Sequence, residues 1–143
     1  SNYYTPQDFD RLVNATTILP VLLQNETHPY HQSMQMKEYI KKYGTVLEAW
    51  YPLGGLDNRM FGGTKNKDTL FGDNVIQTIA ETHCKTPAQV ILRWHLQIGN
   101  VAIPGSKNET HIRENFEIFD FELSDKEMEQ MGALNRDERF SNY

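Results

Sequence analysis

Short apolar runs alternate along this chain with segments that have the spacing of amphipathic helices. The runs lie at residues 18–25, 46–51 and 100–104, and each of them follows a predicted helix. A nearly continuous apolar run of this length is typical of a strand that is covered on both faces, as in a parallel sheet. The alternation therefore predicts an α/β fold in which right-handed crossovers join parallel strands.

Five of the predicted helices begin at recognisable capping residues. Thr5 and Thr86 each precede a proline, which is favoured at the first helical position, and Ser124 begins a capping box. Asp73 and Asn108 are predicted N-caps of two further helices. Apolar spacing sets the predicted helices at about residues 6–14, 32–43, 74–83, 87–97, 109–116 and 125–134.

Three parallel strands leave two unpaired sheet edges, and no polar edge strand in the sequence would protect them. A closed (β/α)8 barrel needs about 250 residues, whereas this chain has 143. We therefore expect residues 1–143 to form an incomplete barrel. Such a barrel either belongs to a larger one or hides its strand edges by self-association.

Composition and charge exclude several classes of protein. The 14 Lys and Arg residues against 19 Asp and Glu residues leave a formal charge of -5, so neither nucleic acid nor an anionic membrane is an expected partner. No apolar run reaches the roughly twenty residues of a membrane helix. Cys84 is the only cysteine, which excludes an intrachain disulfide and predicts a cytoplasmic protein. His28 and His31 lie in a proline-containing turn without a nearby third ligand, so no metal site is expected.

Function in parallel α/β folds lies at the carboxyl ends of the strands. Gln24 is a polar residue at the end of the first apolar run, and its amide suits a carboxamide or carbonyl ligand. We expect the nearby Glu26 and His28 to satisfy each other or adjacent backbone groups rather than to act in catalysis. Trp50 ends the second run beside a glycine turn, where an indole either faces a planar ligand or packs in the core.

Two further segments have features of a binding site. Residues 53–72 contain five of the nine glycines and no periodicity, which is typical of a functional loop, and we interpret it as a lid. Ser106 and Lys107 follow the third run at the start of a predicted helix that also carries His111. That helix start could hold a phosphate, although a solvated helix start explains it nearly as well.

Six segments, in order, resemble the C-terminal half of the aldo-keto reductase family, with its compact microbial members the most similar. The opening SNY resembles the end of GVSNF, LLQNETHPY resembles VNQxExHPY, and AWYPLG resembles AWSPLG or AYSPLG. KTPAQVILRWHLQ is similar to a typical family helix, IPGSKNETHIREN resembles IPKSxxPxRIxEN, and FDFELSDKEM resembles a family closing stretch. Together these segments cover nearly the whole chain.

This resemblance implies the C-terminal part of a TIM barrel and an NAD(P)H-dependent oxidoreductase that reduces aldehydes and ketones to alcohols. Residues 53–72 are then a cofactor clamp. Ser1, Asn2 and Gln24 are implied to hold the nicotinamide carboxamide and Trp50 to stack on its ring. The other implied contacts are Tyr51 and Leu53 at the pyrophosphate, Ser106, Asn108 and His111 at the 2′-phosphate, and Glu114 and Asn115 at the adenine.

The chain departs from the family pattern where the 2′-phosphate is implied to bind. Gly105 replaces a family lysine and His111 replaces an arginine, so the site has fewer strong cationic partners. Lys107 could substitute for them, which leaves both NADPH and NADH open as the cofactor.

The catalytic Asp, Tyr, Lys and His of the family precede the segment that opens this chain, so the resemblance implies no catalytic residue here. We therefore expect the chain alone to be inactive and to require a missing N-terminal half. The alternative is a non-catalytic half-barrel that binds nucleotide or self-assembles.

Overall fold

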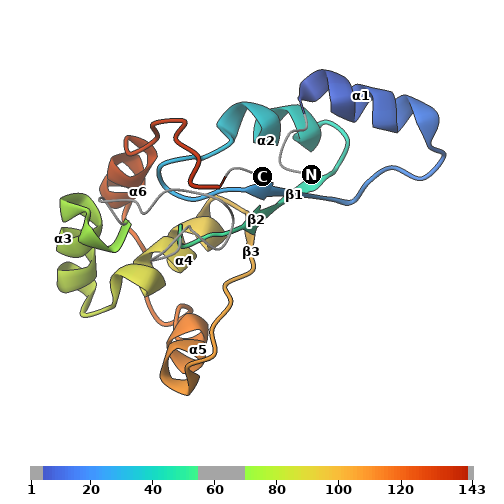
Figure 1. Cartoon of the computed structure of the whole chain (residues 1–143). Helices are drawn as coiled ribbons and strands as arrows, with labels where there is room; N and C mark the ends of the chain where they lie inside the picture. The colour runs from blue at the N-terminus through green and yellow to red at the C-terminus, as the bar shows by residue number, and fades with distance from the viewer. Residues whose placement is uncertain (1–4, 55–69, 142–143) are drawn as a thin grey trace.

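A parallel sheet in the order β1-β2-β3 is the framework of the structure, which is a computed structural model that describes residues 5–54 and 70–141 (Figure 1). The strands are β1 (Leu22–Glu26), β2 (Val46–Trp50) and the short β3 (Val101–Ala102). Adjacent strands are parallel, with Leu22 opposite Val46 and Glu48 opposite Val101. The carboxyl ends of the strands therefore meet at one edge of the sheet.

Helices connect the strands as the α/β alternation predicts. α1 (Pro6–Ala15) precedes β1, and α2 (Met34–Lys41) packs against β2. The turn η2 (Leu70–Gly72) leads into α3 (Asn74–His83) and α4 (Pro87–Gln97), and α5 (Glu109–Phe116) and α6 (Asp125–Gly132) follow β3. Figure 1 shows α1 and α2 together on one side of the molecule and α3, α4 and α6 together on the other. None of the described helices is long and apolar enough to cross a membrane.

The five predicted caps are confirmed. The side chains of Thr5, Asp73, Thr86, Asn108 and Ser124 each accept hydrogen bonds from first-turn amides. Three of them, Thr5, Thr86 and Ser124, form complete capping boxes. Local sequence chemistry is therefore sufficient to place the start of these helices.

α2 is shorter than the predicted helix of residues 32–43. It begins after Ser33, whose φ is 51° and whose side chain makes no capping hydrogen bond. Gln32 lies outside the helix because its side chain amide donates to the carbonyls of Pro29 and Met131, at 2.9 and 2.8 Å. A tertiary contact with the end of α6 therefore sets the start of this helix.

The strand boundaries and the coverage of the sheet also differ from the prediction. β1 begins at Leu22 rather than at residue 18, and Ile18 and Val21 are 81% and 77% exposed. Leu23 and Leu47 are buried under α1 and α2, but Leu22, Val46 and Val101 on the opposite side of the sheet are exposed. The expectation that both faces are covered is wrong for the described residues. The sheet is open, as in part of a barrel, and we call this exposed side the open face.

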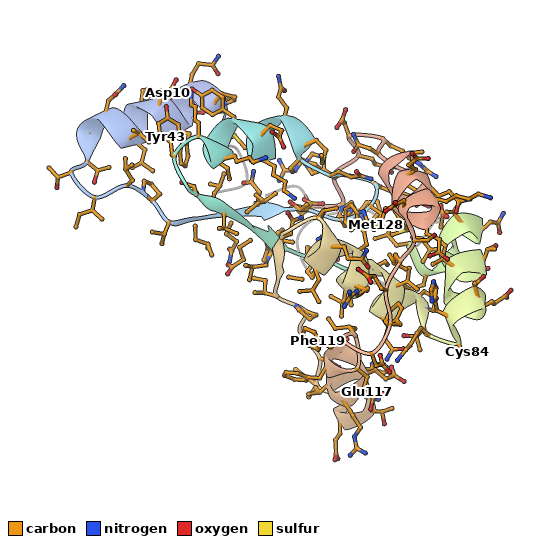
Figure 2. The ribbon with its side chains drawn as sticks, turned by 180° about the vertical axis from the view of Figure 1, so that it is seen from behind. Asp10, Tyr43, Cys84, Glu117, Phe119 and Met128 are labelled. Atoms are coloured by element: carbon orange, nitrogen blue, oxygen red, sulfur yellow. The ribbon has the colours of Figure 1, made fainter. Side chains whose placement is uncertain are left out.

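Two apolar clusters stabilise the chain. The first joins α1, α2 and the sheet through Phe9, Leu23, Met36, Ile40 and Leu47. Asp10 of α1 also accepts a 2.8 Å hydrogen bond from the Tyr43 hydroxyl, and these side chains lie together in Figure 2. The second cluster joins α3, α4, α6 and the C-terminal segment, and it includes Tyr30, Leu70, Trp94 and Phe140. The second cluster lies under the turn that follows β2, because Tyr51 and Leu53 pack against it.

Candidate functional site

The middle of the sheet places an amide beside a carboxylate. Gln24 and Glu48 are the central residues of β1 and β2, so Gln24 lies within its strand rather than at the strand end that the sequence predicted. Gln24 and Glu48 are opposite each other in the register, and Gln24 Nε2 donates to Glu48 Oε1 at 2.6 Å. The Gln24 side chain lies on the open face, as a ligand-binding amide requires. Glu48 was missed by the sequence analysis, although a carboxylate inside an otherwise apolar strand is a signal that could have identified it.

Trp50 ends β2 and begins a turn with unusual backbone geometry. Its indole is half-buried and stacks on the Tyr51 ring, with centroids 5.3 Å apart and planes at 26°. Tyr51 has φ 57° and Gly54 has φ 65°, and the Gly54 N–H donates to the Tyr51 carbonyl at 2.9 Å. Trp50 belongs to neither apolar cluster, whereas Tyr51 and Leu53 pack against the second one. The turn therefore has one side in the core and the indole at its start.

A buried histidine contacts the backbone of this turn. His95 of α4 is fully buried, with its Nε2 3.3 Å from the Pro52 carbonyl and its Nδ1 3.2 Å from Asn100 Nδ2. Burial lowers the pKa of His95 to about 3, so the ring is neutral at pH 7. A neutral ring satisfies both contacts only if Nε2–H donates to Pro52 and Nδ1 accepts from Asn100. This geometry gives His95 a structural role.

The residues at the start of α5 form a second group, beyond β3. Asn108 Oδ1 accepts from the amides of Thr110 and His111, at 2.9 and 3.3 Å, and Ser106 Oγ accepts from the Asn108 amide at 3.0 Å. These predicted phosphate contacts are therefore already used to cap the helix. Lys107 and His111 are exposed, and Glu114 and Asn115 are half-buried on α5.

The structure thus brings Gln24 together with Glu48, and Trp50 together with Tyr51, but it places Ser106, Asn108 and His111 in a separate group. Ser1 and Asn2 lie outside the described residues, as do residues 55–69 of the predicted lid. In the described part of the chain, no group of three His, Cys, Asp or Glu side chains is arranged to hold a metal ion.

Glu26 and His28, which the sequence predicted to contact each other or nearby backbone, do lie in contact. Glu26 Oε1 is 3.1 Å from His28 Nε2, as expected, but the carboxylate also binds the C-terminal segment, which the sequence analysis did not anticipate. Cys84 ends α3 with φ 51°, a conformation that usually belongs to glycine.

The chain resembles proteins of known family along nearly its whole length. The model of the Aldo/keto reductase family matches residues 1–136. Morphine 6-dehydrogenase of Pseudomonas putida is 42% identical over 136 residues, which cover 92% of this chain and 45% of that protein. Glyoxal reductase of Bacillus subtilis is 42% identical over 130 residues, which cover 91% of this chain and 43% of that protein.

Solved structures agree with these sequence matches. A Gox0644 variant in complex with NADPH has a TM-score of 0.81 and 35% identity over 94% of this chain and 45% of that one. The Bombyx mori aldo-keto reductase in complex with NADP has a TM-score of 0.85 and 26% identity over 97% of this chain and 45% of that one. The chain spans less than half the length of these relatives. From its strand order, its motifs and these matches, the chain belongs to the aldo-keto reductase family, as its sequence predicted.

Proposed function

We propose that this chain supplies the cofactor-binding half of an NAD(P)H-dependent reductase of aldehydes and ketones, and that the catalytic residues lie in an N-terminal half. The observation that carries the proposal is that the Gln24 amide and the Trp50 indole lie on adjacent parallel strands, with Gln24 in the middle of β1 and Trp50 at the end of β2. Two similar structures were solved with NADPH or NADP. When bound, a reduced nicotinamide supplies the hydride for carbonyl reduction.

The side-chain chemistry of Gln24 and Trp50 fits a nicotinamide. Gln24 carries both a donor and an acceptor, which is what a carboxamide needs, and its hydrogen bond to Glu48 limits the rotation of its amide. Trp50 offers a planar apolar face, and its contact with Tyr51 limits how the indole can turn. In this proposal Gln24 orients the carboxamide, and Trp50 decides which face of the ring is turned toward a carbonyl.

We assign the remaining cofactor contacts to the turn after β2 and to α5. Tyr51 and Leu53 lie along the pyrophosphate, and Ser106, Asn108 and His111 surround the 2′-phosphate, with Glu114 and Asn115 at the adenine. Because Asn108 caps α5, the first-turn amides of Thr110 and His111 are already bonded. Any preference for NADPH then depends on the exposed side chains of Lys107 and His111 rather than on those amides.

The proposal is tested by titrating the purified chain with NADPH and NADH and following tryptophan fluorescence. We expect saturable quenching that is lost in Trp50→Phe, because Trp94 is buried in the second cluster. Gln24→Leu should weaken binding, whereas the matched variant Gln35→Leu, on the exposed part of α2, should not. An absence of quenching in the folded wild-type chain would contradict a cofactor site in this half alone.

The open face supports a second candidate function, a non-catalytic half-barrel that self-assembles or pairs with an N-terminal half. Leu22, Val46 and Val101 are 40–43% exposed on that face, and burial of such apolar area drives most protein association. Sedimentation of the chain distinguishes the candidates. A dimer that Val46→Lys dissociates would favour assembly, whereas a monomer that binds NADPH would favour the reductase half.

A further inference from the structure

Among the residues that the structure describes, Glu26 is the most deeply buried acidic residue. Glu26 ends β1 and is 1% exposed. Its oxygens accept hydrogen bonds from the amides of Phe140 and Ser141, at 2.5 and 3.3 Å, and from the Ser141 hydroxyl at 2.5 Å. Arg139 Nε and His28 Nε2 are 3.4 and 3.1 Å away. Such a carboxylate is stabilised by five donors, four of which come from residues 139–141.

The C-terminal segment that Glu26 binds places an aromatic ring against the turn after β2. Phe140 stacks on His28, with centroids 4.3 Å apart and planes at 18°, and meets the Tyr30 ring edge-on at 84°. A Cβ built on Gly54 would lie 2.6 Å from the Phe140 ring and 2.8 Å from a Leu70 methyl. The Phe140 ring is therefore packed directly on the Gly54 backbone, where no larger residue fits. In Figure 1 this segment returns from α6 to end beside β1.

The segment also has attachments that do not involve Glu26. The amides of Arg136 and Glu138 both donate to the Tyr30 carbonyl, at 3.0 and 3.1 Å. The Arg136 guanidinium lies over the Tyr30 ring, 3.9 Å from its centroid. Loss of the Glu26 contacts would therefore loosen residues 139–141, while these attachments continue to hold the preceding residues.

We propose that Glu26 is a positioning residue for the cofactor site, which acts through Phe140 on the turn of residues 51–54. By binding the amides of Phe140 and Ser141, Glu26 holds the Phe140 ring on Gly54 and so fixes the turn that carries Tyr51 and Leu53. This inference rests on the proposed function for its link to the cofactor. The mechanical link between Glu26 and Gly54 stands without it.

The test measures amide hydrogen exchange at Gly54, whose N–H is bonded to the Tyr51 carbonyl. In Glu26→Gln we expect exchange at Gly54 to be about tenfold faster, because charge-assisted hydrogen bonds hold the segment. Phe140→Ala should have the same effect without changing Glu26. The matched control is Glu138→Gln, which removes one negative charge from the C-terminal segment and breaks a 3.9 Å ion pair with Arg136 without removing any contact of Glu26. It should leave Gly54 unchanged.

Leu47 is buried in the first cluster, away from the turn. Amide exchange at Leu47 therefore distinguishes local opening of the turn from global unfolding. If Glu26→Gln accelerates Leu47 as much as Gly54, the variant has unfolded globally, and Phe140→Ala and Ser141→Ala then decide the question. Unchanged exchange at Gly54 in both would overturn the proposal.

NADPH titration of the same variants tests the link to the cofactor. We expect the Kd of Glu26→Gln to rise about tenfold, in step with Gly54 exchange, and that of Glu138→Gln to stay constant. If Gly54 exchange rises while the Kd is unchanged, Glu26 does not position the cofactor site. If the wild type binds no NADPH, the proposed function fails for this chain, while the exchange experiment still reports on the link from Glu26 to Gly54.

Discussion

The turn after β2 and the start of α5 are both assigned to the cofactor, but they are held in different ways. Buried residues from distant parts of the chain hold the turn, since His95 of α4 bonds Pro52 and Phe140 packs on Gly54. Residues within three positions of one another hold the start of α5, where Ser106 and Asn108 bond nearby amides. The turn therefore depends on tertiary structure, whereas the start of α5 depends on its own sequence. Substitutions should affect the two regions differently.

The largest effect is expected at Glu26. Burial by itself would raise the pKa of Glu26, but hydrogen bonds from His28, Ser141 and the Phe140 amide outweigh it and lower the pKa to about 2. Against an ordinary value of 4.5, this shift corresponds to about 3 kcal/mol of stability at pH 7. We expect Glu26→Gln to lose about that amount in urea unfolding.

The stability that Glu26 contributes should decrease as the pH falls. Because the pKa is lower in the folded state, the contribution is complete above about pH 5 and is lost as the pH falls toward 2. The difference between wild type and Glu26→Gln should therefore shrink between pH 5 and pH 3. Burial lowers the pKa of His28, so His28 stays neutral at pH 7. A difference that is constant over this range would contradict the assignment, and Glu138→Gln is the control.

The second largest effect is expected at His95, which contacts the Pro52 carbonyl in the same turn. His95→Leu removes the hydrogen bonds of the ring with the Pro52 carbonyl and with Asn100 Nδ2, and we expect a loss of about 2 kcal/mol at pH 8. Protonation of the unfolded wild type destabilises it below pH 6.5, because the pKa of the buried ring is about 3. The deficit of His95→Leu should therefore shrink by about 2 kcal/mol at pH 5. Urea unfolding at both pH values measures it, and an equal deficit at both would show that His95 is not buried as a neutral ring.

A smaller effect is expected at Gly105, beside α5. A Cβ at Gly105 would meet nothing within 4 Å, so Gly105→Lys adds a cation without disturbing the fold. We expect the ratio of NADH to NADPH Kd to rise about tenfold, because a lysine pairs with the 2′-phosphate that only NADPH carries. Gly132→Lys, which adds the same charge in open space on α6, should leave the ratio unchanged. If the ratio of NADH to NADPH Kd is the same in both variants, the 2′-phosphate does not bind near Gly105.

The smallest effect is expected at the cap of α5. Asn108→Ala removes the side chain oxygen that accepts from Thr110 and His111, and we expect a loss of about 1 kcal/mol in thermal unfolding. The consequence should stay local, with no change in Gly54 exchange. Faster exchange at Gly54 in this variant would contradict the conclusion that the start of α5 is held independently of the turn after β2.

Much of the fold was predictable because its signals are local. The capping residues of five helices and the alternation of helices and strands follow from side chains a few positions apart. The start of α2 was not predictable, because Gln32 is held outside the helix by carbonyls that include the distant Met131. The exposure of the open face was also missed, since apolar composition alone does not show which side of a strand is covered.

The candidate site divides in the same way. The sequence placed Gln24 and Trp50 at strand ends, which the structure confirms for Trp50 but not for Gln24, the central residue of β1. The pairing of Gln24 with Glu48 needs the register of β1 and β2. The binding of residues 139–141 by Glu26 joins groups more than 110 positions apart, and no spacing rule predicts it.

The sequence by itself determined the family, the order of helices and strands and the caps, because these depend on motifs and on neighbours within a few residues. Only the tertiary structure decided which side of the sheet is open, how Gln24 is oriented and what holds the turn at Gly54. The physical reason is that hydrogen bonds and packing between distant segments form only when the whole chain is folded, so they leave no periodic pattern in the sequence.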